Sequence, residues 1–288
     1  MTGEPVLGIA SSVTGRRWVW RTGDSRLGLG IAQRHDLPEM VGRLLAARGV
    51  GIDDVPSFLE PTLRALLPDP STLADMDPAA DRLAAAVRSG EHVAVFGDYD
   101  VDGACAAALM TSFLRRMGCE VTTYVPDRIA EGYGPNAPAI SGLCDAGASL
   151  IVCVDCGIAA AEALSVAAGR ADVVVLDHHK AEGPLPPVLA AVNPNRLDCR
   201  SGLRHICAAA VAFLAVVATV RALRRAGYFG GRAEPPLMDL LDLVALATVC
   251  DVMPLTGINR ALVAQGLKIL DRRARRPQCP HPRLPARP

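Results

Sequence analysis

The stretch VAVFGDYDVDG, residues 93–103, joins a run of apolar residues to three aspartates at alternate positions. The apolar run is typical of a buried strand, and the small apolar residues after Gly103 are typical of a helix. The acids Asp98, Asp100 and Asp102 therefore lie at the carboxyl end of a strand, where open α/β sheets bind their ligands. Alternate positions of an extended segment face one side, so we expect the three carboxylates to converge.

Convergence of three carboxylates is unfavourable unless a positive charge lies among them. Two unit charges about 4 Å apart repel by roughly 4 kcal/mol at an effective dielectric of about 20, which exceeds the ~1 kcal/mol of a helix cap. No lysine or arginine lies between Glu91 and Arg115. A divalent cation with oxygen ligands therefore fits these acids. The alternative for this segment alone is that Asp102 caps the helix and the other two acids are solvated.

The composition indicates a globular protein without a strong overall electrostatic field. At 288 residues the chain predicts one large domain with an appendage, or two smaller domains. Half of the residues are hydrophobic, and 30 basic residues balance 30 acidic ones, so any nucleic-acid-binding surface must be local. Nine cysteines, several within apolar runs, indicate the reduced core of a cytosolic protein. The longest apolar run, 206–220, is too short to span a bilayer, so we expect a soluble, cytoplasmic protein with no membrane partner.

The chain divides into three segments by composition and periodicity. Residues 1–90 form an N-terminal extension and helical lead-in, with short helical patterns broken by proline and glycine. Residues 91–270 alternate strand and helix and then turn helical, which predicts an α/β domain with a parallel β-sheet flanked by helices. The expected strands are 92–97, 120–125, 149–155, 172–177 and 188–193, and the expected C-terminal helices are 206–227, 236–249 and 259–270.

The last segment, 271–288, differs from the rest of the chain. It contains five prolines and six arginines and almost nothing to bury, so we expect it to be disordered. A basic tail that touches phosphates is one interpretation. A displaced reading frame at the end of a truncated gene is the other, and it is the one we favour.

The design of residues 93–103 recurs along the chain. The strand-like run before Asp155 is followed by Cys-Gly, and the run before Asp177 is followed by His178 and His179. Asp251 interrupts a later apolar helix. Acids that cap helices explain the carboxylates but not the tandem histidines. Oxygen and imidazole ligands suit Mn²⁺ or Mg²⁺ better than a thiol-rich zinc site, and so many acids predict a pair of ions that share a bridging carboxylate.

Four motifs in this order, DYDVDG, VDCG, DHH and ATVCDVMPL, resemble those of the DHH phosphoesterase family, in particular its single-strand-specific exonucleases. The stretches DRIAEGYG (127–134), NPN (193–195) and HICAAAVAF (205–213) are similar to the same members, and the resemblance covers roughly residues 37–270. It implies a metal-dependent 5′-to-3′ exonuclease that hydrolyses single-stranded DNA to 5′-mononucleotides in repair and recombination. It also implies two bound ions, Mn²⁺ or Mg²⁺, and as partners a single-strand-binding protein and a helicase.

The resemblance also implies roles for individual residues. The implied metal ligands are Asp98, Asp100, Asp102, Asp155, His178 and Asp251, with Asp155 as the bridge. The implied catalytic group is His179, Asp177 and Asp98. Within it His179 faces the scissile phosphate and Asp177 orients the first histidine, His178. The implied nucleotide-binding residues are Arg128, Tyr133 and His205.

Two departures from the family keep alternatives open. The sequence stops soon after Leu270, where family members continue into domains that grip the strand, and Ala208–Ala210 stand where the family often has a glycine. With 4% aromatic residues, stacking surfaces for single strands are few. The first alternative is a DHH phosphoesterase acting on oligoribonucleotides, cyclic dinucleotides or pyrophosphate, although those relatives usually carry a histidine and a proline before the acids. The second is a non-catalytic scaffold, which the complete acidic motifs disfavour, or an inactive remnant, which the missing lobe favours.

Overall fold

The computed structural model describes residues 5–19, 25–181 and 183–272 of the chain. They form two compact units, Met1–Leu66 and Leu67–Pro288. Trp20 and all of the predicted tail beyond Arg272 lie outside the described residues.

The second unit is built on a five-stranded parallel sheet with the strand order β2-β1-β3-β4-β5. The strands are β1 (His92–Gly97), β2 (Glu120–Tyr124), β3 (Leu150–Val154), β4 (Asp172–Leu176) and β5 (Ala190–Val192). All five predicted strands are present, and β1, β3 and β4 are immediate neighbours as the recurring acids require. The three central strands are almost completely buried, which is typical of a parallel sheet covered on both faces.

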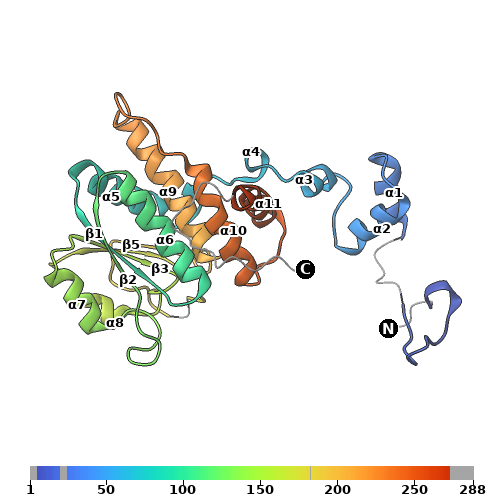
Figure 1. Ribbon diagram of the computed structural model, residues 1–288, viewed down its shortest axis with the longest axis horizontal. Helices are drawn as coiled ribbons and strands as arrows, with labels where there is room; N and C mark the ends of the chain where they lie inside the picture. The colour runs from blue at the N-terminus through green and yellow to red at the C-terminus, as the bar shows by residue number, and fades with distance from the viewer. Residues whose placement is uncertain (1–4, 20–24, 182, 273–288) are drawn as a thin grey trace, which may run out of the picture. The chain divides into compact units, whose positions relative to one another are not determined.

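Helices cover both faces of this sheet (Figure 1). One face carries α5 (Met76–Ser89), α6 (Val101–Arg116) and α9 (Ala208–Arg225), and the other carries α7 (Ala137–Asp145) and α8 (Ala161–Ser165). Helix α9 is apolar on nearly all sides and is correspondingly buried, since it packs on both α5 and α6. On the opposite face Phe96, Ile151 and Val175 of the sheet pack with Ile140 of α7 and Leu164 of α8. The predicted α/β class is confirmed.

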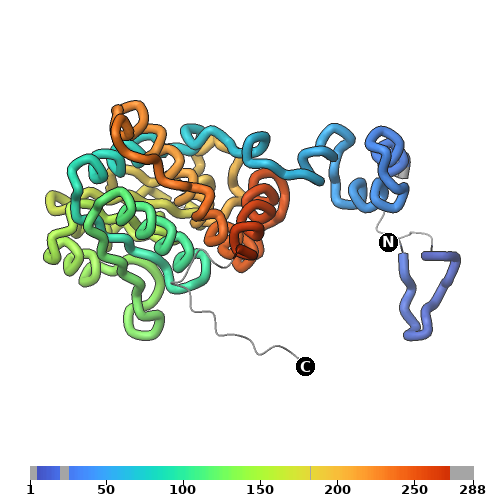
Figure 2. Tube along the Cα trace, turned by 45° about the horizontal axis from the view of Figure 1, so that its top comes forward, coloured from blue at the N-terminus to red at the C-terminus, as the bar shows by residue number. Residues whose placement is uncertain are grey.

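Two further helices close the second unit beside α6 and α9. After η3 (Leu237–Leu240), α10 (Leu241–Cys250) and α11 (Gly257–Asp271) form a tightly packed pair, visible as the orange-to-red hairpin in Figure 2. Helix α10 packs on α6, and Asp251, which follows α10, lies close to Asp102 in the first turn of α6. No helix of the described part of the chain is long and apolar enough to cross a membrane.

The first unit is a small helical assembly. It contains η1 (Val6–Gly8), α1 (Ser25–Arg34), α2 (Glu39–Ala47), α3 (Val55–Leu59) and α4 (Leu63–Leu66). Helices α1 and α2 lie side by side, and Ile31, Leu45 and Val55 form the centre of their core.

The boundary between the units differs from the sequence-based division at residue 90. Helix α5 packs on α9 and β5, so residues 67–90 belong with the sheet. The periodicity of α5 indicates an apolar face, but only the tertiary structure shows what covers it.

The first turn of α6 packs closely against the end of β1 at Gly103, and a substitution there can test this packing. A Cβ at this position would lie 2.6 Å from the carbonyl oxygen of Asp98 and 2.7 Å from its Cβ. We therefore expect Gly103→Ala to lower the free energy of unfolding by about 1–3 kcal/mol, measured by urea denaturation. Gly142→Ala in α7, where a Cβ meets nothing within 4 Å, is the control and should be neutral or stabilising. Equal stability of the two variants would contradict the close packing.

Candidate metal centre

The register of the sheet aligns three acids at one edge. Gly97 pairs with Val154, and Val154 pairs with Leu176, so the residues that follow, Asp98, Asp155 and Asp177, stand in a row across β1, β3 and β4. All three side chains are buried. Their carboxylates therefore share a water-poor edge, where their mutual repulsion is only weakly screened.

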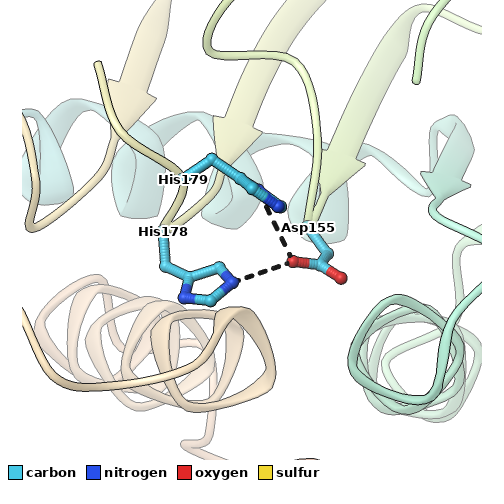
Figure 3. A group of neighbouring side chains, drawn as sticks. All are labelled: Asp155, His178 and His179. Atoms are coloured by element: carbon cyan, nitrogen blue, oxygen red, sulfur yellow. Dashed lines mark ion pairs between the residues drawn. The ribbon is translucent and has the colours of Figure 1, made fainter. Parts of the chain in front are cut away.

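Asp155 is the centre of this arrangement. Its backbone adopts a left-handed conformation with φ 61°, which is uncommon for a residue other than glycine. One set of possible ligand atoms comes from Asp98, Asp100 and Asp155, and another comes from Asp155, His178 and His179. Within each set the atoms lie within 4.8 Å of one another. Figure 3 shows the second set, with Asp155 turned toward both histidine rings.

His178 joins Asp155 to two further acids. Its Nε2 atom lies 3.3 Å from Asp155 Oδ1, 3.6 Å from Asp251 Oδ2 and 3.7 Å from Asp102 Oδ2. Asp102, His178 and Asp251 form a third set of possible ligand atoms. The six residues that the sequence suggests as ligands are thus brought together, with Asp155 and His178 each belonging to two sets.

The three aspartates of the opening motif do not converge on one point, which corrects the expectation from an extended segment. Helix α6 begins at Val101, so the chain rotates between Asp100 and Asp102. Asp100 caps α6 by accepting a hydrogen bond from the Gly103 N–H at 2.9 Å, the role that one interpretation gave to Asp102.

Asp102 contacts a different helix. Its carboxylate accepts hydrogen bonds from the N–H groups of Ala208 at 2.6 Å and Ala209 at 2.8 Å, in the first turn of α9. The amino end of α9 is therefore occupied by a carboxylate of the same chain. This contact fixes the position of Asp102 relative to His178.

Asp177 is saturated with hydrogen-bond donors. Its Oδ1 atom accepts from the main-chain N–H groups of His178 and His179 and lies 2.7 Å from His179 Nδ1, and its Oδ2 atom accepts from the Ile158 N–H. The expectation that Asp177 orients His178 is wrong for the ring, because the imidazole that it contacts is that of His179. It holds His178 only through the main chain.

The electrostatics of the two histidines follow from these contacts. The hydrogen bond to Asp177 is the largest reason that the pKa of His179 is raised to about 9, so its ring is protonated at neutral pH. Burial opposes ionisation of Asp177, but His179 and the N–H donors outweigh it and lower its pKa. Burial also opposes the charge on His178, and the surrounding acids outweigh it and raise that pKa.

Three of the other acids keep carboxylate oxygens that accept no hydrogen bond. Asp98 Oδ1, Asp251 Oδ2 and both carboxylate oxygens of Asp155 are buried without a hydrogen bond. Burial raises the pKa of all three acids, and that of Asp155 to about 8, with Asp102 and Asp100 adding to the shift and His178 opposing it. Carboxylate oxygens are the ligands that Mn²⁺ and Mg²⁺ prefer, so the unpartnered buried oxygens fit the expected ions.

The loop after β2 brings two of the predicted nucleotide-binding residues to this edge. The Tyr133 hydroxyl donates to the Asp155 carbonyl at 3.2 Å, and its ring lies edge-on to His179. The Arg128 guanidinium lies 5.1 Å from the centre of the Tyr99 ring, within the acidic motif itself. His205 belongs to none of the three ligand sets and contributes its carbonyl oxygen to a contact with Asn259.

The sequence matches the DHH family, N-terminal domain, over residues 92–248, which is more than half of the chain and includes the strand-end acids and both histidines. The chain belongs to the DHH family. The matched residues include every candidate metal ligand except Asp251, which lies three residues beyond them.

Relatives and solved structures of the DHH family resemble this chain closely. The single-stranded-DNA-specific exonuclease RecJ of Dickeya dadantii is 41% identical over 235 residues, covering 80% of this chain and 40% of the relative. RecJ of Bacillus subtilis is 32% identical over 257 residues, covering 89% of this chain and 31% of the relative. The chain thus spans less than half the length of these relatives.

Among solved structures, exonuclease RecJ bound to manganese matches with TM-score 0.60 and 35% identity, covering 68% of this chain and 48% of that one. RecJ of Thermus thermophilus in complex with Mn²⁺ matches with TM-score 0.67 and 30% identity, covering 84% of this chain and 33% of that one. A structure of the Thermus protein in complex with Mg²⁺ matches with TM-score 0.56 and 28% identity, covering 84% of this chain and 29% of that one.

Two residues that support the DHH domain's metal centre were not singled out from the sequence. Tyr99 carries Arg128 on its ring, and Asn259 of α11 is fully buried and donates to the carbonyl oxygens of His205 at 2.6 Å and Pro254 at 3.1 Å. Asn259 thereby joins the entry to α9, which holds Asp102, to the turn after Asp251. An asparagine among the apolar residues of the buried face of α11 is the signal that could have identified it.

The buried carboxyl of Asp155 makes the stability of the metal-free protein depend on pH. Its pKa is raised to about 8 in the folded protein, whereas an aspartate in an unfolded chain titrates at about 3.9. The folded state binds this proton more tightly, so the contribution to stability is complete below about pH 4 and is lost as the pH rises through about 8. With EDTA present, we expect Asp155→Asn to unfold at a higher temperature than the wild type at pH 9, by at least roughly 2–4 °C.

The same comparison at pH 5 is the control, because the advantage of Asp155→Asn should be smaller there. Added Mn²⁺ should raise the unfolding temperature of the wild type and leave the variant nearly unchanged. A variant that is less stable than the wild type at pH 9 in EDTA would rule out an unfavourable buried charge at Asp155.

Proposed function

We propose that this DHH domain is the catalytic part of a metal-dependent, single-stranded-DNA-specific 5′-to-3′ exonuclease. The observation that carries the proposal is the edge of the sheet at which Asp98, Asp155 and Asp251 present buried carboxylate oxygens without partners, beside His178. The similarity to RecJ supplies the substrate class.

We assign two ions to two of the three ligand sets. Asp98, Asp100 and Asp155 would hold one Mn²⁺ or Mg²⁺, while His178, Asp102 and Asp251 would hold the other, with Asp155 lying between the two sets. When bound, such ions supply Lewis acidity that activates water and neutralises charge on a phosphate. The similar RecJ structures contain Mn²⁺ or Mg²⁺, which supports this assignment.

His179 has a separate role, in which its ring contacts the substrate. Because Asp177 holds Nδ1 and keeps the ring protonated, His179 can present a second N–H, at Nε2, to a phosphate oxygen. A charged hydrogen bond of this kind stabilises the negative charge that develops on phosphate during hydrolysis. Asp177 acts on the reaction through His179, and Asp98 acts as a ligand beside it.

Arg128 and Tyr133 would bind the nucleotide next to the scissile bond. Arg128 supplies a positive charge at the rim of the acidic edge, and Tyr133 supplies an exposed aromatic ring beside His179. Charge on the phosphates and stacking on the bases are the two contributions that bind single strands without regard to sequence. His205, in the segment before α9, is proposed as a third contact.

The wider context of the activity is proposed from the family resemblance. It includes release of 5′-mononucleotides, a role in DNA repair and recombination, and cooperation with a single-strand-binding protein and a helicase. The eight cysteines among the described residues are all free thiols, which supports a reducing, cytoplasmic location.

The test is a nuclease assay of the purified protein with Mn²⁺. The substrates are a 5′-labelled single strand, the matching duplex, a dinucleotide and pyrophosphate. We expect mononucleotides from the single strand and none from the duplex. Cleavage of only the small substrates would instead identify a small-molecule phosphoesterase, and cleavage of none would identify an inactive remnant.

Asp155→Ala should lose more than about 100-fold in the rate of hydrolysis, beyond the usual effect of a residue that only supports a ligand. Asp145→Ala is the matched control. It removes an exposed carboxylate at the end of α7 that pairs with Arg170, and it should keep the wild-type rate. Far-ultraviolet circular dichroism should show both variants folded. A folded Asp155→Ala with full activity would refute the assignment of the metal centre.

A further inference from the structure

The segment Asn193-Pro194-Asn195 takes no part in the proposed chemistry, yet it forms hydrogen bonds with the main chain of the tandem histidines. The side-chain amide of Asn193 donates to the His179 carbonyl oxygen at 2.9 Å. The side-chain amide of Asn195 donates to the His178 carbonyl oxygen at 2.5 Å. Two asparagines that follow the carboxyl end of β5 thus hold two consecutive peptide groups of the loop after β4.

The two asparagines are fixed relative to each other. The Oδ1 atom of Asn193 accepts the main-chain N–H of Asn195 at 2.7 Å, and Asn193 is fully buried. Pro194, between them, restricts the backbone on both sides of its ring. The amide that holds His178 and the amide that holds His179 therefore form one rigid unit, which we call the asparagine clamp (Asn193–Asn195).

The clamp is in turn anchored to the sheet. Arg196, which directly follows it, is buried and donates to the Ala191 carbonyl of β5 and to Asp75 at the start of α5, both at 2.5 Å. Asp198 pairs with the other side of the same guanidinium. These contacts leave the clamp little freedom to move with respect to β5 and α5.

The peptides of the two histidines are held on both sides. Asp177 accepts their N–H groups, and the clamp donates to their carbonyl groups. This matters because His178 Nε2 must stay near three acids that come from β3, α6 and the end of α10. A small rotation of either peptide would swing the ring away from one of them.

We propose that the asparagine clamp is the positioning device that holds the tandem histidines in place for metal binding. The clamp touches neither ligand atoms nor the proposed substrate site, so Asn193 and Asn195 are positioning residues. The proposal rests on the metal centre of the proposed function, but it does not depend on the substrate being DNA.

The test is the affinity for Mn²⁺, measured by calorimetry on the whole chain. Asn195 is only half-buried, so Asn195→Ala removes the contact to His178 with little loss of packing. Supports of metal ligands typically change metal affinity about 10- to 100-fold, and we expect a loss of that size. Asn195→Asp keeps the shape but places an acceptor against the His178 carbonyl, and should bind Mn²⁺ at least as weakly.

Asn136→Ala is the matched control. It removes an asparagine that caps α7 and contacts Glu131, so it costs stability without touching the histidine loop. We expect its Mn²⁺ affinity to equal that of the wild type. A merely structural role for Asn195 would lower the unfolding temperature as in Asn136→Ala and leave the affinity unchanged.

The outcomes test the clamp proposal independently of the proposed nuclease function. Wild-type affinity for Mn²⁺ in folded Asn195→Ala and Asn195→Asp overturns the clamp, even if the chain degrades single-stranded DNA. Weakened affinity in both variants supports the clamp, even if the wild type cleaves no nucleic acid and the proposed function fails. If Asn195→Ala does not fold, the affinity of Asn195→Asp decides.

Discussion

The arrangement depends on one electrostatic constraint, which is that Asp155 is buried in the middle of an acidic sheet edge without a hydrogen bond to either carboxylate oxygen. The register of a parallel sheet makes this crowding unavoidable, because β1, β3 and β4 end at the same level. Protonation of the carboxyl or a nearby cation relieves it, and the imidazole of His178 at 3.3 Å provides only part of that relief. Binding of a proton or a cation at this site would therefore stabilise the folded protein.

The acids at this edge divide into two classes by their hydrogen bonds. Asp177 and Asp102 accept hydrogen bonds from main-chain N–H groups. Asp98, Asp155 and Asp251 retain buried oxygens without donors. The hydrogen bonds of the first class orient a side chain and a helix, although Asp102 is also a candidate ligand, and the free oxygens of the second class can contact an ion directly. Burial opposes ionisation of all these acids; the partners of Asp177 outweigh it and lower its pKa, whereas burial prevails at Asp102 and Asp155 and raises theirs.

The supports of the centre come from segments far apart in the chain. Amide groups of Asn193, Asn195 and Asn259 each hold carbonyl oxygens of loops that carry or flank the candidate ligands. None of the three contacts a candidate ligand atom. Each fixes a main-chain segment instead, which is an effective way to limit movement of a loop whose own side chains must stay free for binding.

The sequence by itself determined the strands, the class of fold, the order of the motifs and the meeting of acids at one sheet edge, because periodicity marks strands locally and alternation of strands with helices implies parallel pairing. Only the tertiary structure decided the rest. The onset of α6 at Val101 sent Asp102 toward α9, and the ring bound by Asp177 proved to be that of His179. Helix α5 joined the sheet rather than the lead-in. These outcomes depend on which distant surfaces pack together, and apolar periodicity marks a buried face without naming its partner.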